Sequence, residues 1–272
     1  MNINSYIKNK KIIKKISSFN KKVFTKKTNF SDEITLCEFT TNKSVQASFS
    51  IFTNYMQKKY KTKIIAYNSD IQRNFKSKVK KFLNKNLYYN YNYELYRSFN
   101  VLDFIFIQNK IKIKIKSDCM IKKVFSKMKT KSDLLKLKVN DIWIGDLIYD
   151  SYIQKYSVST IDLKSKNFKL FFKDCIYAFY FWEDYFNKTQ VKAVVGSHSV
   201  YYSAIPMRIG VKKGCDVFQV NFHNVYRLSK KKLFGYDLFS DYKKIFNNFN
   251  SNYKNKALRY SKKQCLKRFD GK

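Results

Sequence analysis

The sequence predicts an α/β protein built on a Rossmann-like, doubly wound parallel sheet in three layers, α/β/α. Short runs of apolar and β-branched residues alternate along the chain with longer segments in which apolar residues recur at helical spacing. Successive runs are separated by about one helix, which is the length that a right-handed crossover between parallel strands requires. Apolar residues make up 44% of the 272 residues, enough for a large core.

The clearest strand, helix, strand unit is expected near the N-terminus. Residues 33–39, EITLCEF, form a β-branched and apolar run that predicts a strand. Residues 42–60 place Val45, Phe49 and Met56 on one helical face, with Phe52 beside them. Residues 61–68, KTKIIAYN, predict the second strand of a parallel pair.

The rest of the chain continues the alternation, with two ambiguous stretches. The KIKIKIK segment, residues 110–116, is interpreted as a strand or a charged edge, and the tyrosine-rich residues 88–100 as a connection. Helices are predicted at 70–87, 117–128, 145–156, 167–186, 201–213 and in the C-terminal tail, and strands at 101–107, 191–195 and 216–220. The helix at 167–186 is apolar nearly all round, which predicts that it is buried.

The charge of the chain is strongly positive, and two explanations are open. Lys and Arg number 56 against 19 Asp and Glu, a net charge of +37 that is typical of nucleic-acid-binding proteins. Only six of the 56 are arginine, the side chain that recognises phosphates and bases in bidentate fashion. We therefore favour drift toward A/T-rich codons, with lysine on solvated faces, and expect no specific nucleic-acid partner.

The remaining composition indicates a cytoplasmic protein. The five cysteines are odd in number and include no C-x-x-C pair, which fits neither a disulfide framework nor a zinc site. The longest apolar run, Cys175 to Trp182, is too short to span a bilayer. The N-terminal residues 1–31 carry nine lysines before any acid and are expected to form a flexible arm or a short amphipathic helix, with weak contact to the inner face of a membrane as an open alternative.

Familiar catalytic signatures are missing. The sequence holds no G-x-G-x-x-G, no G-x-x-x-x-G-K-[ST], no G-x-S-x-G and no H-E-x-x-H. These absences disfavour dinucleotide oxidoreductases, P-loop NTPases, α/β-hydrolases and zincins. With two histidines and dispersed cysteines we expect no metal and no bound cofactor.

The first candidate site lies in the segment IGDLIYDSY. A helix from Gly145 places Asp146, Tyr149 and Asp150 on one face, at positions i, i+3 and i+4. Two carboxylates and a phenol can hold sugar hydroxyls, or one carboxylate can take a proton. The structural alternative is that Asp146 is a first-turn acid and that Asp150 pairs with a lysine.

The second candidate site follows the predicted strand at 191–195. In GSHSVYY a glycine turn precedes Ser197, His198 and Tyr201, and parallel-sheet proteins bind ligands beyond such strand ends. His198 is the best general base in the chain; capping of a helix is its structural alternative. Arg208 is a candidate for a phosphate or carboxylate, or for a structural ion pair. His223, after the next strand, is the lower-ranked member of the same site.

Three stretches together resemble a known family. They are residues 37–68, 144–162 and 191–220, and they are similar in order and spacing to bacterial surface-carbohydrate, capsule-type polysaccharide biosynthesis proteins. These look like glycosyltransferases of the GT-B architecture, with two Rossmann-like domains. The resemblance extends from about Glu33 to the C-terminus and places the family's G-D-L-I-Y-D block on residues 145–150 and its S-H block on residues 197–198.

The resemblance implies that the chain is the N-terminal, acceptor-side portion of such an enzyme. It implies a Rossmann-like acceptor-side domain at 32–250 and a helix or linker at 251–272 leading to a missing second domain. A carbohydrate acceptor is the expected partner, with a nucleotide-sugar donor bound only through that second domain. His198 is then the expected base, with Asp146 and Asp150 orienting the acceptor or the imidazole and Gly145, Tyr149, Ser197, Tyr201, Arg208 and His223 as binding residues.

Two other classes of function stay open. The first is a basic nucleic-acid-binding or ribosomal-type protein, which would bind RNA or DNA with a steep dependence on salt. The second is a non-catalytic domain that binds a carbohydrate or a partner enzyme. Its mark would be glycan binding without turnover.

Overall fold

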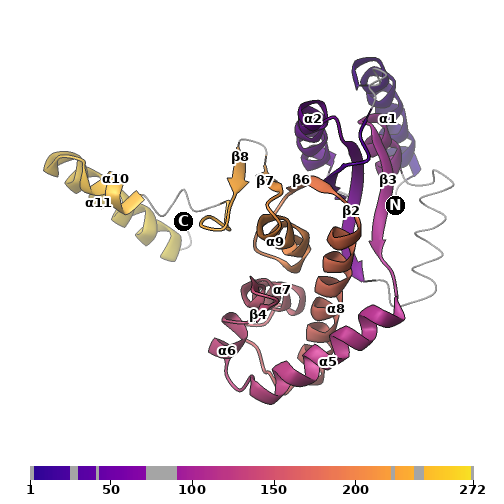
Figure 1. Ribbon diagram of the computed structural model, residues 1–272. Coiled ribbons are helices and arrows are strands. Elements are labelled where there is room, and N and C mark those ends of the chain that lie inside the picture. Colours follow the sequence, from indigo (N-terminus) through magenta and orange to yellow (C-terminus); the bar gives the residue numbers. More distant parts are fainter. Residues whose placement is uncertain are drawn as a thin grey trace. The chain divides into compact units, whose positions relative to one another are not determined.

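The computed structural model describes residues 3–24, 30–40, 43–71, 91–221, 224–235 and 242–270. It is an α/β protein with a six-stranded sheet in the order β3-β2-β1-β6-β7-β8 (Figure 1). The strands of this sheet are β1 (Ile34–Glu38), β2 (Lys63–Ile71), β3 (Val101–Ile107), β6 (Val191–Gly196), β7 (Asp216–Val220) and β8 (Val225–Leu228). The predicted α/β class is confirmed.

The sheet is parallel except at one edge. β1, β2, β3, β6 and β7 pair in parallel, whereas β8 turns back and pairs antiparallel with β7. The chain lays down β1 to β3 toward one edge and β6 to β8 toward the other, so the direction of winding reverses between β1 and β6. Cys37 of β1 pairs with Val195 of β6, and both strands therefore end at the same point of the sheet.

Helices cover both faces of the sheet. The helices described are α1 (Ile3–Phe24), α2 (Lys43–Tyr60), α4 (Tyr91–Ser98), α5 (Ile111–Lys127), α6 (Lys131–Leu135), α7 (Gly145–Tyr156), α8 (Lys166–Lys188), α9 (Ile205–Lys212), α10 (Tyr242–Asn247) and α11 (Ser251–Phe269). α2 and α4 contribute to one hydrophobic cluster with Cys37, and α8 and α9 to another with Leu36. Leu36 and Cys37 are neighbours in β1, so their side chains point to opposite faces of the sheet. The two clusters are therefore the contacts of the sheet with the helices on its two faces, and the structure has three layers.

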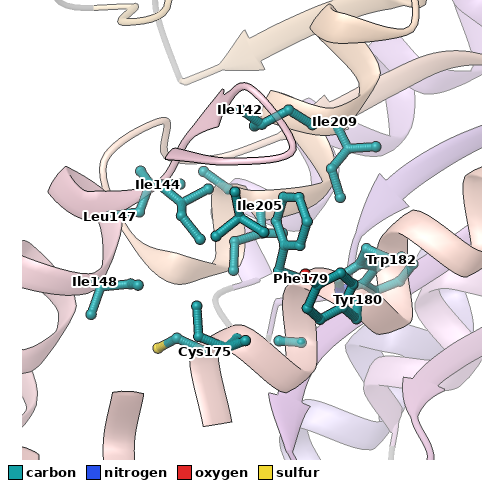
Figure 2. Packing of buried hydrophobic residues seen from close by; sticks show 14 of the residues in the cluster. Ile142, Ile144, Leu147, Ile148, Cys175, Phe179, Tyr180, Trp182, Ile205 and Ile209 are labelled. Atoms are coloured by element: carbon teal, nitrogen blue, oxygen red, sulfur yellow. The ribbon is translucent and has the colours of Figure 1, made fainter. Parts of the chain in front are cut away.

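The larger cluster surrounds α8, as its apolar sequence predicted. Phe172, Phe179 and Trp182 of this helix are fully buried. Figure 2 shows how side chains of α7, α8 and α9 meet in this cluster; the labelled ones include Leu147, Phe179 and Ile205. The helix begins at Ser165, whose hydroxyl accepts a hydrogen bond from the amide of Phe168. Burial of α8 fixes α7 and α9, the helices that carry the candidate residues.

Three predictions of local structure need correction. The KIKIKIK segment is part of α5 and not a strand, because Ile113, Ser117 and Ile121 recur at helical spacing and are buried. The tyrosine-rich connection holds α4, and the edge strand β8 breaks the parallel pattern. Most of the helix predicted at 70–87 lies outside the described residues.

The chain divides into two compact units, residues 1–233 and 234–272. The first unit includes α1, which packs on α4 through a small cluster of Ile13, Leu95 and Phe99. For residues 1–31 the expectation was a flexible arm or a short amphipathic helix, and a domain boundary was predicted near residue 250. The second unit contains α10 and α11, neither of which has a buried residue.

The short hairpin of β4 (Lys138–Val139) and β5 (Ile142–Trp143) connects α6 to α7, and Gly145 begins α7 in close contact with α6. A Cβ at this position would lie 1.9 Å from the carbonyl oxygen of Leu134 and 2.9 Å from that of Leu135. Main-chain atoms cannot move aside as a side chain can. Glycine is therefore required here by space.

We expect Gly145→Ala to destabilise the first unit by about 3 kcal/mol or more, beyond ordinary overpacking, because the added methyl meets backbone. Gly210→Ala is the matched control, since its Cβ would meet the side-chain methyl groups of Val217 and Val194 at 3.0 and 3.1 Å. Urea denaturation measures the free energy of unfolding of the two variants. A Gly145→Ala protein as stable as the wild type would contradict this requirement.

Candidate functional site

A carboxylate and a serine meet where β1 and β6 end. Glu38 is the last residue of β1, and Ser197 directly follows the last residue of β6. Glu38 Oε2 accepts hydrogen bonds from the amide of Ser197 at 2.6 Å and from its hydroxyl at 2.7 Å. This contact lies at the point where the winding of the sheet reverses, the usual ligand-binding edge of open α/β sheets.

His198 extends this contact into a chain of three polar groups. Its Nδ1 lies 2.8 Å from the hydroxyl oxygen of Ser197. The serine hydroxyl has one proton, and an ionised Glu38 can only accept, so that proton is donated to the carboxylate. Nδ1 must then be the donor to the serine oxygen. The arrangement selects the tautomer that leaves Nε2 unprotonated and able to act as a base.

The imidazole is exposed and held between two neighbours. Its ring centroid lies 5.7 Å from that of the Tyr201 ring, and its Nδ1 is hydrogen-bonded to the hydroxyl of Ser197. Partial burial lowers the pKa of His198 below its ordinary value of 6.5. The ring is therefore mostly neutral at pH 7, which is the state that a general base needs.

Gly196 allows Glu38 and the neighbouring strands to approach. A Cβ on this residue would lie 2.7 Å from Met207 Sδ, 3.1 Å from the Tyr67 hydroxyl oxygen and 3.3 Å from Glu38 Oε2. The Tyr67 hydroxyl is fully buried and has no hydrogen-bond partner among the described residues. Burial, followed by the charge of Glu38, raises the pKa of Tyr67 well above 10. It is thus a protonated donor beside the carboxylate.

The second candidate cluster forms a buried ion pair. Arg208 Nη2 of α9 lies 2.7 Å from Asp146 Oδ2 of α7, and both side chains are nearly inaccessible to water, 2% and 11% exposed. The guanidinium also lies 5.2 Å from the centroid of the Trp143 ring and donates to the carbonyl of Trp143 at 3.3 Å. Arg208 was predicted to bind a phosphate or carboxylate group or to form a structural ion pair, and the structure shows the ion pair with Asp146.

Burial shifts the titration of both candidate aspartates. Burial raises the pKa of Asp146, and the charge and hydrogen bond of Arg208 oppose this rise. Asp150, one turn along α7, is half-buried; burial and then the charge of Asp146 raise its pKa. Perturbed pKa values are typical of functional sites and also of structural ion pairs such as that of Asp146 with Arg208.

The loop after β6 connects the two clusters. Arg208 Nη2 donates to the carbonyl of Ser199 at 3.4 Å, and Ser199 in turn donates to Gln219 Oε1 of β7 at 2.6 Å. The amide of Tyr202 donates to the hydroxyl of Ser151 on α7 at 2.7 Å. The ends of β6 and β7 and the helices α7 and α9 thus hold the backbone that presents His198.

The other predicted residues separate into distinct roles. Tyr149 contacts α6, where Lys131 Nζ lies 4.5 Å from its ring centroid. Gly145 serves the contact between α6 and α7 described above. Tyr201 lies beside His198 as expected, whereas His223 falls outside the described residues. The carboxylate that hydrogen bonds link to the imidazole, through Ser197, is Glu38, and the roles expected for Asp146 and Asp150 stay predictions.

Glu38 and Tyr67 were missed by sequence reasoning, although a signal for each was present. Both lie within predicted strands near their carboxyl ends, the edge at which parallel sheets bind ligands, and Glu38 is in addition a charged residue at the end of an apolar strand. The pairing of β1 with β6, more than 150 residues apart, could not be read from local sequence.

A basic pocket includes Arg208, one member of the ion pair, in its lining. The hollow has a volume of about 350 Å³ and is lined by Arg208, Trp143, three lysines and Asp141, together with apolar residues. The three lysines are Lys138, Lys212 and Lys230. Asp141 lies 3.8 Å from Lys212, so the lining keeps a positive excess that suits an anionic group.

No group of three or more His, Cys, Asp or Glu side chains is placed to hold a metal ion within the described ranges. Comparison with protein-family models, with curated proteins and with solved structures gave no match. Fold and site therefore define the class only: an α/β protein with a mostly parallel sheet and a polar cluster at its switch point.

We expect nitrogen-15 NMR to show His198 as the Nδ1-protonated tautomer at neutral pH, with a pKa below 6.5. Ser197→Ala removes the hydroxyl that accepts from Nδ1 and should abolish the tautomer preference. His223→Asn simplifies the assignment, because only two histidines are present. A dominant Nε2-protonated tautomer in the wild type would contradict the proposed proton arrangement.

We expect Arg208→Met to destabilise the first unit by about 3–5 kcal/mol, because it leaves a buried carboxylate unpaired. Arg227→Met is the control: Arg227 also pairs with an aspartate, Asp216, but is 72% exposed, and its loss should cost about 1 kcal/mol or less. The double variant Asp146→Leu/Arg208→Met should recover much of the loss. If urea denaturation gave the same loss of unfolding free energy for the two single variants, the buried ion pair would contribute no more to stability than the exposed one.

Proposed function

We propose that this chain is the acceptor-binding half of a glycosyltransferase that acts in the synthesis of capsule-type surface polysaccharides. The observation that carries the proposal is the Glu38–Ser197–His198 chain of hydrogen bonds at the carboxyl ends of β1 and β6. Sugar transfer requires removal of a proton from an acceptor hydroxyl. A neutral imidazole with a free Nε2 is suited to remove it.

The neighbouring groups support an acceptor that carries several hydroxyls. Ser197 and Glu38 fix the imidazole, so that little reorganisation is needed when it takes up a proton. The proton taken up at Nε2 leaves an imidazolium that stays linked to the Glu38 carboxylate through the Ser197 hydroxyl. Asp150, half-buried on α7, is the available carboxylate for further acceptor hydroxyls, because Asp146 is engaged by Arg208.

The basic pocket adds a preference for acidic acceptors. Lys138, Lys212 and Lys230 line a hollow together with Trp143. An aromatic ring can stack on a sugar ring, and the lysines attract a carboxylate or phosphate. The pocket and His198 approach the same loop through Arg208, which lines the pocket and bonds Ser199. We therefore favour a uronic acid or phosphorylated sugar as the acceptor.

In this proposal the fold is the N-terminal domain of a GT-B enzyme. The nucleotide-sugar donor would be bound by a second Rossmann-like domain, and the described chain would supply acceptor binding and the base without a cofactor of its own. The reaction would take place in the cytoplasm, where the five free cysteines would remain reduced.

We expect His198→Ala to lower transferase turnover by about 10²–10⁴-fold, the usual contribution of a general base. Turnover is followed as nucleoside diphosphate release after a nucleotide-sugar and a separate donor-binding domain are added to the chain, because the proposal assigns donor binding to that second domain. Acidic oligosaccharides that bind the chain on a glycan array serve as acceptors. Acceptor affinity should change less than about threefold, because the base acts mainly in the transition state.

Lys192→Ala, at the opposite end of β6, is the matched control and should retain wild-type turnover; this lysine pairs with Glu33 and lies outside the site. A decrease of less than about threefold for His198→Ala would remove the residue from the role of base. Glycan binding without turnover, even when a donor-binding domain is supplied, would favour a non-catalytic binding domain. Failure to bind any glycan would overturn the proposal.

A further inference from the structure

Between Lys11 and Phe24, α1 presents three different faces. One face is docked: Ile13, Ser17 and Asn20 are 2–4% exposed, and Asn20 donates a hydrogen bond to Ser98 of α4 at 3.0 Å. This contact fixes the rotation of the helix about its own axis. The side chains that face solvent are therefore set by the fold and are not free to turn inward.

A second face of α1 is apolar and exposed. Ile12, Ile16, Phe19 and Val23 are 46%, 40%, 66% and 43% exposed. Their spacing of four, three and four residues places them within a stripe about 60° wide on an α-helix. Four large apolar side chains in one exposed row are costly to leave in water, which indicates that something covers them.

The third face is basic and borders the stripe. Lys11, Lys15 and Lys22 are exposed, and helical spacing places them beside the stripe on the side away from α4. No acidic residue occurs before Asp32 in the sequence. An apolar stripe bordered by lysines is the pattern of a helix that lies in the plane of an anionic membrane surface.

We propose that α1 binds the first unit to the surface of an anionic lipid bilayer. The apolar stripe would enter the boundary between headgroups and acyl chains, and the lysines would contact lipid phosphates. No helix among the described segments is long and apolar enough to cross a membrane, so α1 would lie on the bilayer. This inference does not depend on the proposed glycosyltransferase activity.

Charge decides between a bilayer and the other occupants of the stripe. Two copies of the chain meeting through α1 would bring rows of lysine together in a protein of net charge +37, which opposes association. Nucleic acid would engage the lysines but would leave the four apolar side chains exposed. An anionic bilayer satisfies both faces at once.

The test is co-sedimentation of the purified chain with phosphatidylcholine vesicles that contain or lack phosphatidylglycerol. We expect binding only to the anionic vesicles, weakened by high salt. Ile12→Ser/Phe19→Ser should weaken the affinity about tenfold or more through lost apolar burial. Lys15→Glu/Lys22→Glu should weaken it at least as strongly through lost attraction to the lipid charge.

Matched controls come from α5. Ile111 and Ile115 are 80% and 65% exposed, and Ile111→Ser/Ile115→Ser should bind vesicles as the wild type does. Lys122→Glu/Lys123→Glu is the control for Lys15→Glu/Lys22→Glu and should also bind vesicles as the wild type does. All substituted side chains are exposed, so thermal unfolding should be unchanged in each variant.

Three outcomes would overturn the inference. The first is equal binding by the stripe variant and the wild type, and the second is equal binding to vesicles with and without phosphatidylglycerol. The third is self-association or RNA binding that the stripe variant abolishes, which would assign the stripe to a second copy or to nucleic acid. Loss of transferase activity in His198→Ala would leave vesicle binding intact, so the two proposals fail separately.

Discussion

The parallel pairing of β1 with β6 in the middle of the sheet is the constraint on which the candidate site depends. It places Glu38 against Ser197, two residues that lie 159 positions apart in the chain. The contact is possible because Gly196 leaves room between Met207, Tyr67 and the carboxylate. Once Glu38 is held there, the proton on the Ser197 hydroxyl has one acceptor, and the tautomer of His198 follows.

A second set of interactions keeps this arrangement rigid. Asp146 and Arg208 form a buried ion pair. The pair contributes more to positioning the loop after β6 than to the free energy of unfolding, because desolvation offsets much of the attraction between the two charges. Arg208 bonds the carbonyl of Ser199, and Ser151 bonds the amide of Tyr202. The loop that carries His198 is thereby tied to α7 and α9, which are in turn packed on the aromatic surface of α8.

Sequence patterns predicted the parts of the fold that depend on local order. The buried helix α8 and the run from β6 through α9 to β7 follow directly from apolar periodicity. The segment 110–116 misled because alternating Ile and Lys fits a strand until Ile113, Ser117 and Ile121 are seen packed on the core. For the site, position at a strand end predicted Ser197 and His198, and their part in a functional site stays a prediction. The partner Glu38 depended on long-range strand pairing, and the roles assigned to Asp146, Asp150 and Tyr201 remain predictions.

The contact between Gly145 and the carbonyl groups of α6 limits how this protein can change over time. Most tight packing can be relieved by a smaller neighbour, so a harmful substitution is often rescued by a second one. Here the neighbours are carbonyl oxygens of residues 134 and 135, and every amino acid carries the same carbonyl. No substitution in α6 therefore creates space for a side chain at position 145. A second substitution cannot rescue the loss of Gly145, and this position depends on a single residue type.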